Sequence, residues 1–234
     1  MDLAAAVAPT TLARQRTLPV VDPLLSLLPE GGLTRGRSIA CRGIAATSLT
    51  LALTAAATEA GAWLAVVDVP WLGVEAAAEL GVPLERLVRI APSSPGDAGS
   101  WADIVAAVLD GFEIVVTRVP RRINAGMLRR VQSRVQAREG VLLAIGDPGA
   151  LGVDVAMEAA PPVWEGVGQG DGHLRGRRVT VVAGGRRVPR PRRAELWLPG
   201  PGGGVSAVEP SAVPSLDPAS KPSVVAEPVL RSVG

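Results

Sequence analysis

The chain has 234 residues, of which 47% are hydrophobic, so it can bury one substantial core and still carry a tail. A single cysteine, Cys41, and a single histidine, His173, exclude a disulfide framework and leave almost no basis for thiolate or histidine metal sites or for a Ser-His-Asp triad. Neither a secretory signal nor an apolar run of membrane-spanning length is visible. We therefore expect a cytoplasmic protein, and association with the nucleoid is compatible with this expectation.

Positive charge is concentrated in the middle of the chain, although the net charge is only +2. Residues 1–113 hold 7 arginines against 12 acidic residues, whereas residues 114–193 hold 15 arginines against 6 acidic residues. The asymmetry predicts an anionic partner or an acidic protein face for the basic part.

Apolar runs alternate with amphipathic segments between residues 38 and 147. Continuous apolar runs of this length are typical of strands buried on both faces of a sheet. We expect strands at 38–42, 63–69, 87–92, 113–119 and 141–147, and helices at 46–60, 74–80, 101–109 and 123–138. Ser100 and Asp103 are the predicted N-cap pair of the third helix. The alternation predicts an α/β domain whose mainly parallel sheet is covered by helices.

The pattern changes after residue 147. A glycine-rich loop is expected at 165–176, followed by strands at 178–183 and 194–198 that form an antiparallel hairpin at the edge of the sheet. We divide the chain into a flexible arm (1–16), a core domain (17–199) and a disordered tail rich in Pro, Ser and Gly (200–234).

The first predicted strand and helix flank the position at which nucleotide-binding proteins carry a phosphate-binding loop, G-x-x-x-x-G-K-[ST]. On this template Gly43 is the first glycine and Thr50 the final hydroxyl, but Ser48 replaces the second glycine and Leu49 the lysine. Leucine cannot pair with phosphates, and the only lysine is Lys221, in the tail. These residues either bind phosphate weakly through the helix N-terminus or, as we favour, only shape the turn.

Three longer segments resemble RecA recombinases. GGLTRGRSIACRG (31–43) resembles the approach to the first core strand, and WLAVVDVPWLGVEAAAELGVPLERLVRIAP (63–92) resembles a strand that ends in an acid and leads through a helix to the next strand. RRVTVVAGGRRVPRPRRAELWLP (177–199) resembles the late β-hairpin. The resemblance covers about residues 18–198 and implies a RecA-like core with a C-terminal antiparallel hairpin extension.

The resemblance also shows what the chain lacks. Asp68 matches the strand-end acid, but Pro70 stands at the position of the family's catalytic glutamate, and Thr117 at that of the Walker B aspartate. Asp147 stands where the family carries a glutamine that senses the γ-phosphate. We therefore expect no ATP hydrolysis, no catalytic residue, no cofactor and no metal. Asp68 is expected to cap the following helix.

A RecA-like chain of this length without an intact phosphate loop resembles the ImuA-prime proteins of actinobacteria. That resemblance implies a non-catalytic accessory protein in DNA-damage-induced mutagenesis (translesion synthesis, within the SOS response). Its implied partners are ImuB, an inactive Y-family polymerase relative, and an error-prone C-family polymerase. Two alternatives remain open: a weak NTP-binding regulatory ATPase, and a regulator that contacts RecA filaments.

Twelve arginines are candidates for a surface that binds a partner or DNA. They lie on the helix at 123–138 and along the hairpin: Arg129, Arg130, Arg134, Arg138, Arg175, Arg177, Arg178, Arg186, Arg187, Arg190, Arg192 and Arg193. Guanidinium groups suit phosphate contacts, but the chain has no tyrosine and one phenylalanine with which to stack bases. A solvated basic hairpin and a dock for an acidic protein remain alternatives to DNA.

Overall fold

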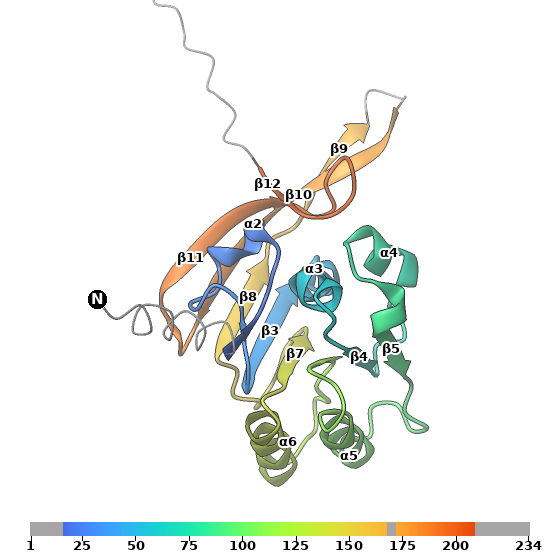
Figure 1. Ribbon diagram of the computed structural model, residues 1–234, viewed down its shortest axis with the longest axis vertical. Helices are drawn as coiled ribbons and strands as arrows, with labels where there is room; N and C mark the ends of the chain where they lie inside the picture. The colour runs from blue at the N-terminus through green and yellow to red at the C-terminus, as the bar shows by residue number, and fades with distance from the viewer. Residues whose placement is uncertain (1–15, 168–171, 209–234) are drawn as a thin grey trace, which may run out of the picture.

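A computed structural model describes residues 16–167 and 172–208. Its centre is a ten-stranded sheet with the strand order β12-β11-β10-β8-β3-β7-β6-β4-β5, in which β9 also pairs with β10 (Figure 1). The strands from β8 to β5 run parallel to one another, and those on the far side of β8 are antiparallel. This is the predicted α/β fold: a mainly parallel RecA-like core with an antiparallel extension.

The parallel strands are short and mostly buried. They are β3 (Arg37–Gly43), β4 (Leu64–Val67), β5 (Leu87–Ile90), β6 (Ile114–Thr117), β7 (Val141–Ile145) and β8 (Val155–Ala159). Every residue of β4, β6 and β7 is buried, as expected for apolar runs covered on both faces. The five predicted strands correspond to β3, β4, β5, β6 and β7 within a few residues. Of these, β5 is half-exposed because it forms the edge of the sheet.

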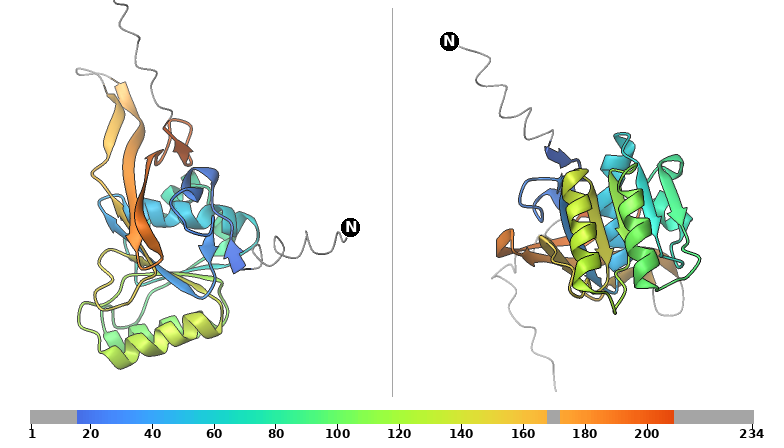
Figure 2. Two further views of the ribbon diagram at one scale, coloured as in Figure 1. Left: turned by 90° about the vertical axis from the view of Figure 1, so that its left-hand side faces the viewer. Right: turned by 90° about the horizontal axis from the view of Figure 1, so that it is seen from below.

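Helices cover both faces of the sheet. The helices are α2 (Asp22–Leu25), α3 (Ala46–Glu59), α4 (Val74–Glu79), α5 (Ala98–Val108) and α6 (Ala125–Ala137), with a short 3-10 turn, η1 (Leu84–Arg86). One core cluster contains residues of α3 and α4, and a second contains residues of α5 and α6. The two pairs lie on opposite sides of the strands (Figure 2).

The antiparallel extension is larger than the sequence predicts. It consists of β9 (Val163–Val167), β10 (Gly172–Gly185), β11 (Val188–Trp197) and β12 (Ser206–Ala207). Most of the expected loop at 165–176 belongs to the paired strands β9 and β10, and the expected connection at 184–193 shrinks to Arg186 and Arg187 because both strands run on toward the turn. The described chain continues past the predicted core boundary to β12, which pairs with β11.

Two local features differ from the sequence predictions. Strand β8 was not predicted, although it pairs in parallel with β3. The N-cap of α5 is Asp97, whose carboxylate accepts from the Ser100 N–H at 2.7 Å, so the helix begins before the expected Ser100–Asp103 pair. The predicted arm lies almost wholly in residues 1–15, and most of the predicted tail lies in residues 209–234, which are outside the described residues. A two-stranded sheet of β1 (Thr17–Leu18) and β2 (Leu33–Thr34) precedes β3.

Candidate functional site

The positions predicted for a degenerate nucleotide site do come together. Gly43 ends β3, Thr117 ends β6 beside Val67 of β4, and Asp68 and Asp147 follow β4 and β7. Because the carboxyl ends of parallel strands meet at one edge of the sheet, these residues share the edge at which α/β proteins bind ligands. The strand order β3-β7-β6-β4 makes their strands neighbours.

The structure has only a short turn at the position of the phosphate-loop template. Only Ile44 and Ala45 separate β3 from α3, and the N–H of Leu49 already donates to the Ala45 carbonyl at 2.9 Å. Leu49, at the lysine position, is therefore inside the first turns of the helix, with its side chain 0% exposed in the core. The helix extends through residues that a phosphate-binding loop would use to surround its ligand.

Gly43 is needed here for packing. Its φ of +88° is a conformation that L side chains rarely adopt, and a Cβ at this position would lie 2.0 Å from the carbonyl oxygen of Ala159 in β8. The strand β8 therefore approaches the β3–α3 turn closely. The same glycine that matches the phosphate-loop template is explained by this contact.

Two side chains from other parts of the chain contact the first turn of α3. The guanidinium of Arg177, on β10, donates to the hydroxyl of Ser48 and to the carbonyl of Leu198. Burial lowers the pKa of Arg177 from its ordinary value, and the negative charge of the Glu79 carboxylate partly offsets this lowering. The indole N–H of Trp71 lies 3.3 Å from the hydroxyl of Thr47. Both hydroxyls at the helix start thus have partners within the protein.

The two threonines at the metal-binding positions are also engaged. Thr50 is fully buried and donates to the Ala46 carbonyl at 2.8 Å. Thr117 is fully buried and accepts from the indole N–H of Trp101 at 2.8 Å. Next to them, burial raises the pKa of the Cys41 thiol to about 12, against a smaller lowering by the hydrogen bond with Thr50. None of these groups faces solvent as a metal or phosphate ligand would.

Asp68 does not cap α4, contrary to the sequence prediction. The N-cap of α4 is Gly73, without a side-chain cap, and the Asp68 carboxylate instead lies 3.8 Å from the guanidinium of Arg118. Asp68 is 4% exposed and has a φ of +54°, which is unusual for a residue with a side chain. The Arg118 guanidinium in turn lies 5.3 Å from the ring centre of Trp71. Asp68, Arg118 and Trp71 therefore form one chain of contacts at this edge.

The last two predicted positions lie on the surface. Pro70 is exposed, and its carbonyl accepts from Arg89 at 3.3 Å. Asp147 accepts from the N–H of Gly149 at 3.0 Å and lies 3.6 Å from Arg42, with its side chain 84% exposed. The sequence identified the edge correctly but gave no signal for the roles of Arg118 and Arg177, because these depend on contacts between distant segments.

The arginines on α6 and at its C-terminal end mostly face acids on α5 or just after it. Arg130 pairs with Asp103 at 2.6 Å, and Arg134 and Arg138 both pair with Asp110. The hydrogen bond from Arg134 is the main cause of the lowered pKa of the Asp110 carboxyl group. Arg129 is exposed and has no hydrogen bond or ion pair with another described residue. Most of the predicted basic face of this helix is therefore a neutralised ladder between two helices.

The hairpin arginines divide in the same way. Arg178 pairs with Glu165 and Glu195, and Arg192 donates to the carbonyls of Ser26 and Leu28. Arg186 and Arg187 share Asp154, and Arg187 also contacts Glu30. Within the described chain, the candidates without such contacts are Arg129, Arg175, Arg190 and Arg193, all exposed.

Three tryptophans are on the surface rather than in the core. Trp63 is 39% exposed, Trp71 50% and Trp164 48%, and each has an arginine guanidinium 5.0–5.3 Å from the centre of a ring: Arg86, Arg118 and Arg177 respectively. Only Trp101 is among the fully buried side chains.

Among the residues that the structure describes, no cluster of His, Cys, Asp and Glu could hold a metal ion, and no helix is long and apolar enough to cross a membrane. The crystal structure of the RadB recombinase matches this chain with a TM-score of 0.58 and 15% identity, over 80% of this chain and 97% of that one. That likeness supports the RecA-like fold.

Sequence comparison gives the family. An uncharacterized protein of Mycobacterium tuberculosis (strain ATCC 25618 / H37Rv), Rv3395c, is 31% identical over 149 residues, covering 60% of this chain and 71% of the relative. Residues 26–149, from the region of α2 to the loop after β7, match the family described as the MT3502 N-terminal domain. The chain belongs to the MT3502 N-terminal domain family.

Proposed function

We propose that this protein is a non-catalytic RecA-like adaptor in DNA-damage-induced mutagenesis, which binds a polymerase-like partner of the ImuB type and, through it, an error-prone C-family polymerase. The observation that carries the non-catalytic part is the filled edge of the sheet. Leu49 is buried, Ser48 and Thr47 contact Arg177 and Trp71, and Thr117 holds Trp101. A fold that keeps this edge but uses it for internal contacts is suited to binding other proteins.

The adaptor part is supported by the open end of the sheet. Strand β5 is the last strand on its side, and no described strand pairs with its outer edge. The carbonyl of Ile90 accepts a hydrogen bond from the Asp68 N–H, so the backbone groups of Ile90 point toward β4. Because backbone groups alternate along a strand, the N–H and carbonyl of Arg89 face outward. An unprotected edge of this kind can accept a strand from another chain.

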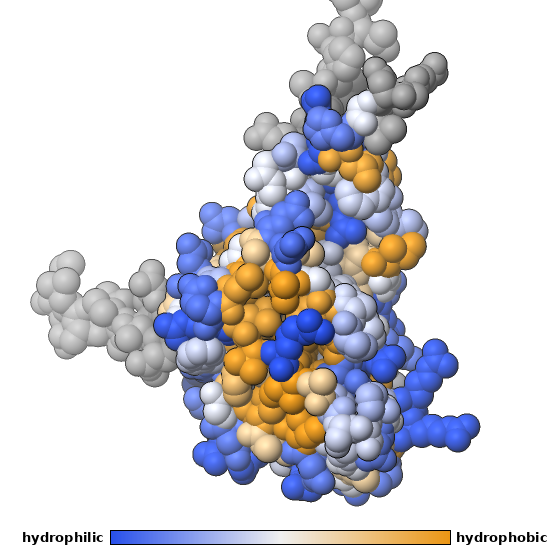
Figure 3. Space-filling model, turned by 90° about the vertical axis from the view of Figure 1, so that its right-hand side faces the viewer, coloured by the Kyte–Doolittle hydropathy of each residue, from blue (hydrophilic) through white to orange (hydrophobic). Residues whose placement is uncertain are grey.

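Apolar surface surrounds this edge. Figure 3 shows a hydrophobic area in the middle of the face that carries β5. Leu84 is 44% exposed and Val74 40%, and a depression of about 270 Å³ beside β5 is lined by Val69, Ile90, Pro92 and other residues. Apolar area next to unpaired backbone groups favours an extended protein segment over a nucleic acid.

The chemistry of the partner segment follows from Arg89. This exposed arginine lies on the strand itself and lines the depression. We infer that the partner contributes an extended segment with apolar side chains and one acidic side chain opposite Arg89. The acid would provide the register, and the apolar contacts most of the affinity.

A binding experiment tests this proposal with the purified ImuB-type protein from the same organism. Arg89→Glu reverses the charge at the edge, and we expect it to weaken binding at least about 30-fold, the loss of a 2 kcal/mol contact. Arg129→Glu on α6 is the matched control, since Arg129 is also exposed and has no described ion pair. Equal affinities of the two variants and the unmodified protein would refute the interface.

A second measurement tests the absence of nucleotide chemistry. We expect neither ATP hydrolysis nor a rise in melting temperature with millimolar ATP and Mg²⁺. A ligand at 100 times its dissociation constant would stabilise the fold by about 2.7 kcal/mol. A melting shift that requires both ATP and Mg²⁺ would instead favour a weak NTP-binding regulator.

A further inference from the structure

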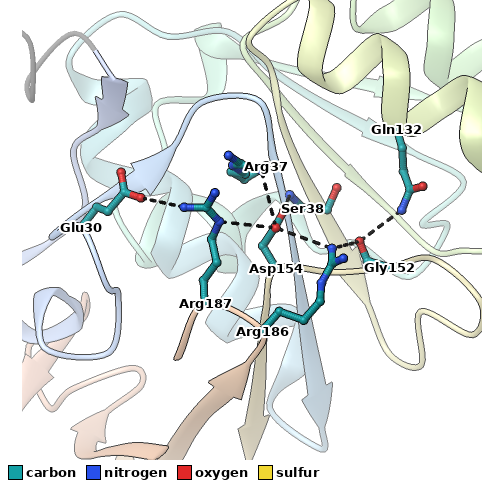
Figure 4. Close-up of polar contacts among 8 residues, drawn as sticks. All are labelled: Glu30, Arg37, Ser38, Gln132, Gly152, Asp154, Arg186 and Arg187. Carbon is teal, nitrogen blue, oxygen red and sulfur yellow. Dashed lines mark hydrogen bonds and ion pairs between the residues drawn. The ribbon is translucent and has the colours of Figure 1, made fainter. Parts of the chain in front are cut away.

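A second group of arginines lies at the opposite end of the sheet, where the parallel strands begin. Asp154 directly precedes β8, and its carboxylate accepts from the N–H of Ser38 at the start of β3, at 3.2 Å. Arg37 comes from the same end of β3, and Arg186 and Arg187 form the turn between β10 and β11. Figure 4 shows the three guanidinium groups directed toward this one carboxylate.

The cluster has more cations than its acids can neutralise. Nitrogen atoms of Arg186, Arg187 and Arg37 lie 3.6, 3.7 and 3.8 Å from the same oxygen, Oδ1 of Asp154. All three distances exceed a normal hydrogen bond. Glu30 contacts only Arg187, at 3.4 Å. Three positive charges therefore lie close together around a carboxylate whose side chain is only 13% exposed.

Backbone hydrogen bonds hold the hairpin turn in addition to the contacts of these three arginines. Backbone bonds already join the segments: Asp154 N–H donates to the Ser38 carbonyl at 2.8 Å, and Arg187 N–H donates to the Asp154 carbonyl at 3.2 Å. Partly exposed ion pairs contribute little to stability, and like charges at short range repel. An additional anion would relieve that repulsion.

The surface around the cluster has room for such an anion. A depression of about 400 Å³ is lined by Arg37, Arg186 and Arg187, and an adjoining one of about 340 Å³ is lined by Arg37 and Arg187 again. The second depression adds Arg16 and Arg35. The acids on these two linings are Asp154, Glu30 and Glu139, which leaves five arginines against three carboxylates.

We propose that this five-arginine cluster (Arg16, Arg35, Arg37, Arg186 and Arg187) binds phosphate groups of a nucleic-acid backbone. Guanidinium forks match phosphate oxygens, and two depressions that share Arg37 and Arg187 suit successive phosphates. Val135 is the only large apolar residue lining either depression, so a peptide would find no apolar anchor there. The site contacts phosphates and carries no base readout, because neither lining contains an aromatic residue. It is independent of the proposed protein interface at β5.

The test measures binding of the full chain to a labelled duplex and a single strand of mixed sequence, across a salt series. Removing two phosphate contacts should lower the slope of log K against log salt by about 1.8 for duplex and about 1.4 for single strand. At about 0.1 M salt this corresponds to about 60-fold and about 25-fold weaker binding. We expect this result for Arg186→Gln combined with Arg187→Gln.

The same hairpin offers a matched control. Arg175→Gln with Arg193→Gln removes the same charge from exposed residues, and Arg193 is about 20 Å along β11 from the turn. We expect the control to change affinity less than about twofold, and Arg186→Lys with Arg187→Lys to keep the salt slope. Melting curves verify folding, and Arg186→Gln alone, at a side chain 70% exposed, serves if the double variant unfolds.

Three outcomes would overturn the proposal. The first is an equal loss in the turn and control variants, which would indicate diffuse electrostatic attraction. The second is the absence of nucleic-acid binding at about 50 mM salt. The third is that inorganic phosphate raises the melting temperature through Arg186 and Arg187 while nucleic acid does not bind, which would indicate a site for free anions only. Loss of ImuB-type binding in Arg89→Glu has no bearing on these results.

Discussion

The role of Gly43 can be tested by adding a single methyl group. Gly43→Ala places a Cβ 2.0 Å from the carbonyl oxygen of Ala159, and that neighbour is backbone within the β3–β8 pair, which cannot rotate away. A positive φ costs an L residue about 1 to 2 kcal/mol, and overpacking adds about 1 to 3 kcal/mol. We therefore expect the free energy of unfolding to fall by about 2 to 5 kcal/mol, measured by urea denaturation.

Gly61→Ala provides the comparison. Gly61 lies in the loop after α3 with a φ of +103°, but a Cβ there meets nothing within 4 Å. This variant should lose only the conformational part, about 1 to 2 kcal/mol. If Gly43→Ala costs no more than Gly61→Ala, the close approach of β8 is not what requires glycine, and our explanation of the retained glycine fails.

Three further predictions concern buried groups at the same edge. Thr117→Val leaves the Trp101 indole N–H without its acceptor and should cost about 1 to 3 kcal/mol in urea denaturation, with no change in the core volume. Leu49→Lys restores the template residue but buries an ammonium group, so we expect a loss of at least about 3 kcal/mol and no melting shift with ATP–Mg²⁺; a stable variant that binds ATP would contradict this. The pKa of the Cys41 thiol is about 12 in the folded protein and about 8.5 in the unfolded chain. The contribution of the protonated thiol to the free energy of unfolding is therefore complete below about pH 8.5 and is lost as the pH rises toward 12. Between pH 7 and 10 the free energy of unfolding should fall by about 2 kcal/mol more than in Cys41→Ala, and parallel pH profiles would refute the buried thiol.

The parallel half of the fold was predictable because burial on both faces leaves a strong pattern. The strands β4, β6 and β7 are apolar throughout, and α6 places Leu128, Val131 and Val135 in the core at helical spacing. Strand β8 was missed because it is a run of only five residues, VAMEA, in which buried residues alternate with the half-exposed Ala156 and the exposed Glu158. Most of β9 and the first residues of β10 were mistaken for a loop because they pair with each other and residues 172–175 of β10 are exposed, which removes the apolar signal.

The candidate site was predictable in position but not in content. Strand ends mark the edge, so Gly43, Asp68 and Thr117 could be placed there from sequence. The groups that occupy the edge come from elsewhere: Arg177 lies 129 residues after Ser48 in the chain, and Trp101 lies on α5. Contacts of this kind are set by packing and have no local sequence pattern.

The C-terminal extension reaches from the edge with the predicted nucleotide-site positions to the five-arginine cluster at the opposite end of the sheet. The core strand next to it, β8, places the Ala159 carbonyl against Gly43, and its own strand β10 brings Arg177 to Ser48. At its other end the same extension presents Arg186 and Arg187 beside Asp154. Restoring the lysine at position 49 alone would therefore not restore a phosphate loop, because the turn after β3 is too short and β8 and Arg177 hold it in place. Arg177 is thus engaged within the fold, whereas the arginines at the opposite end of the sheet outnumber the acids around them, as the proposed phosphate binding requires.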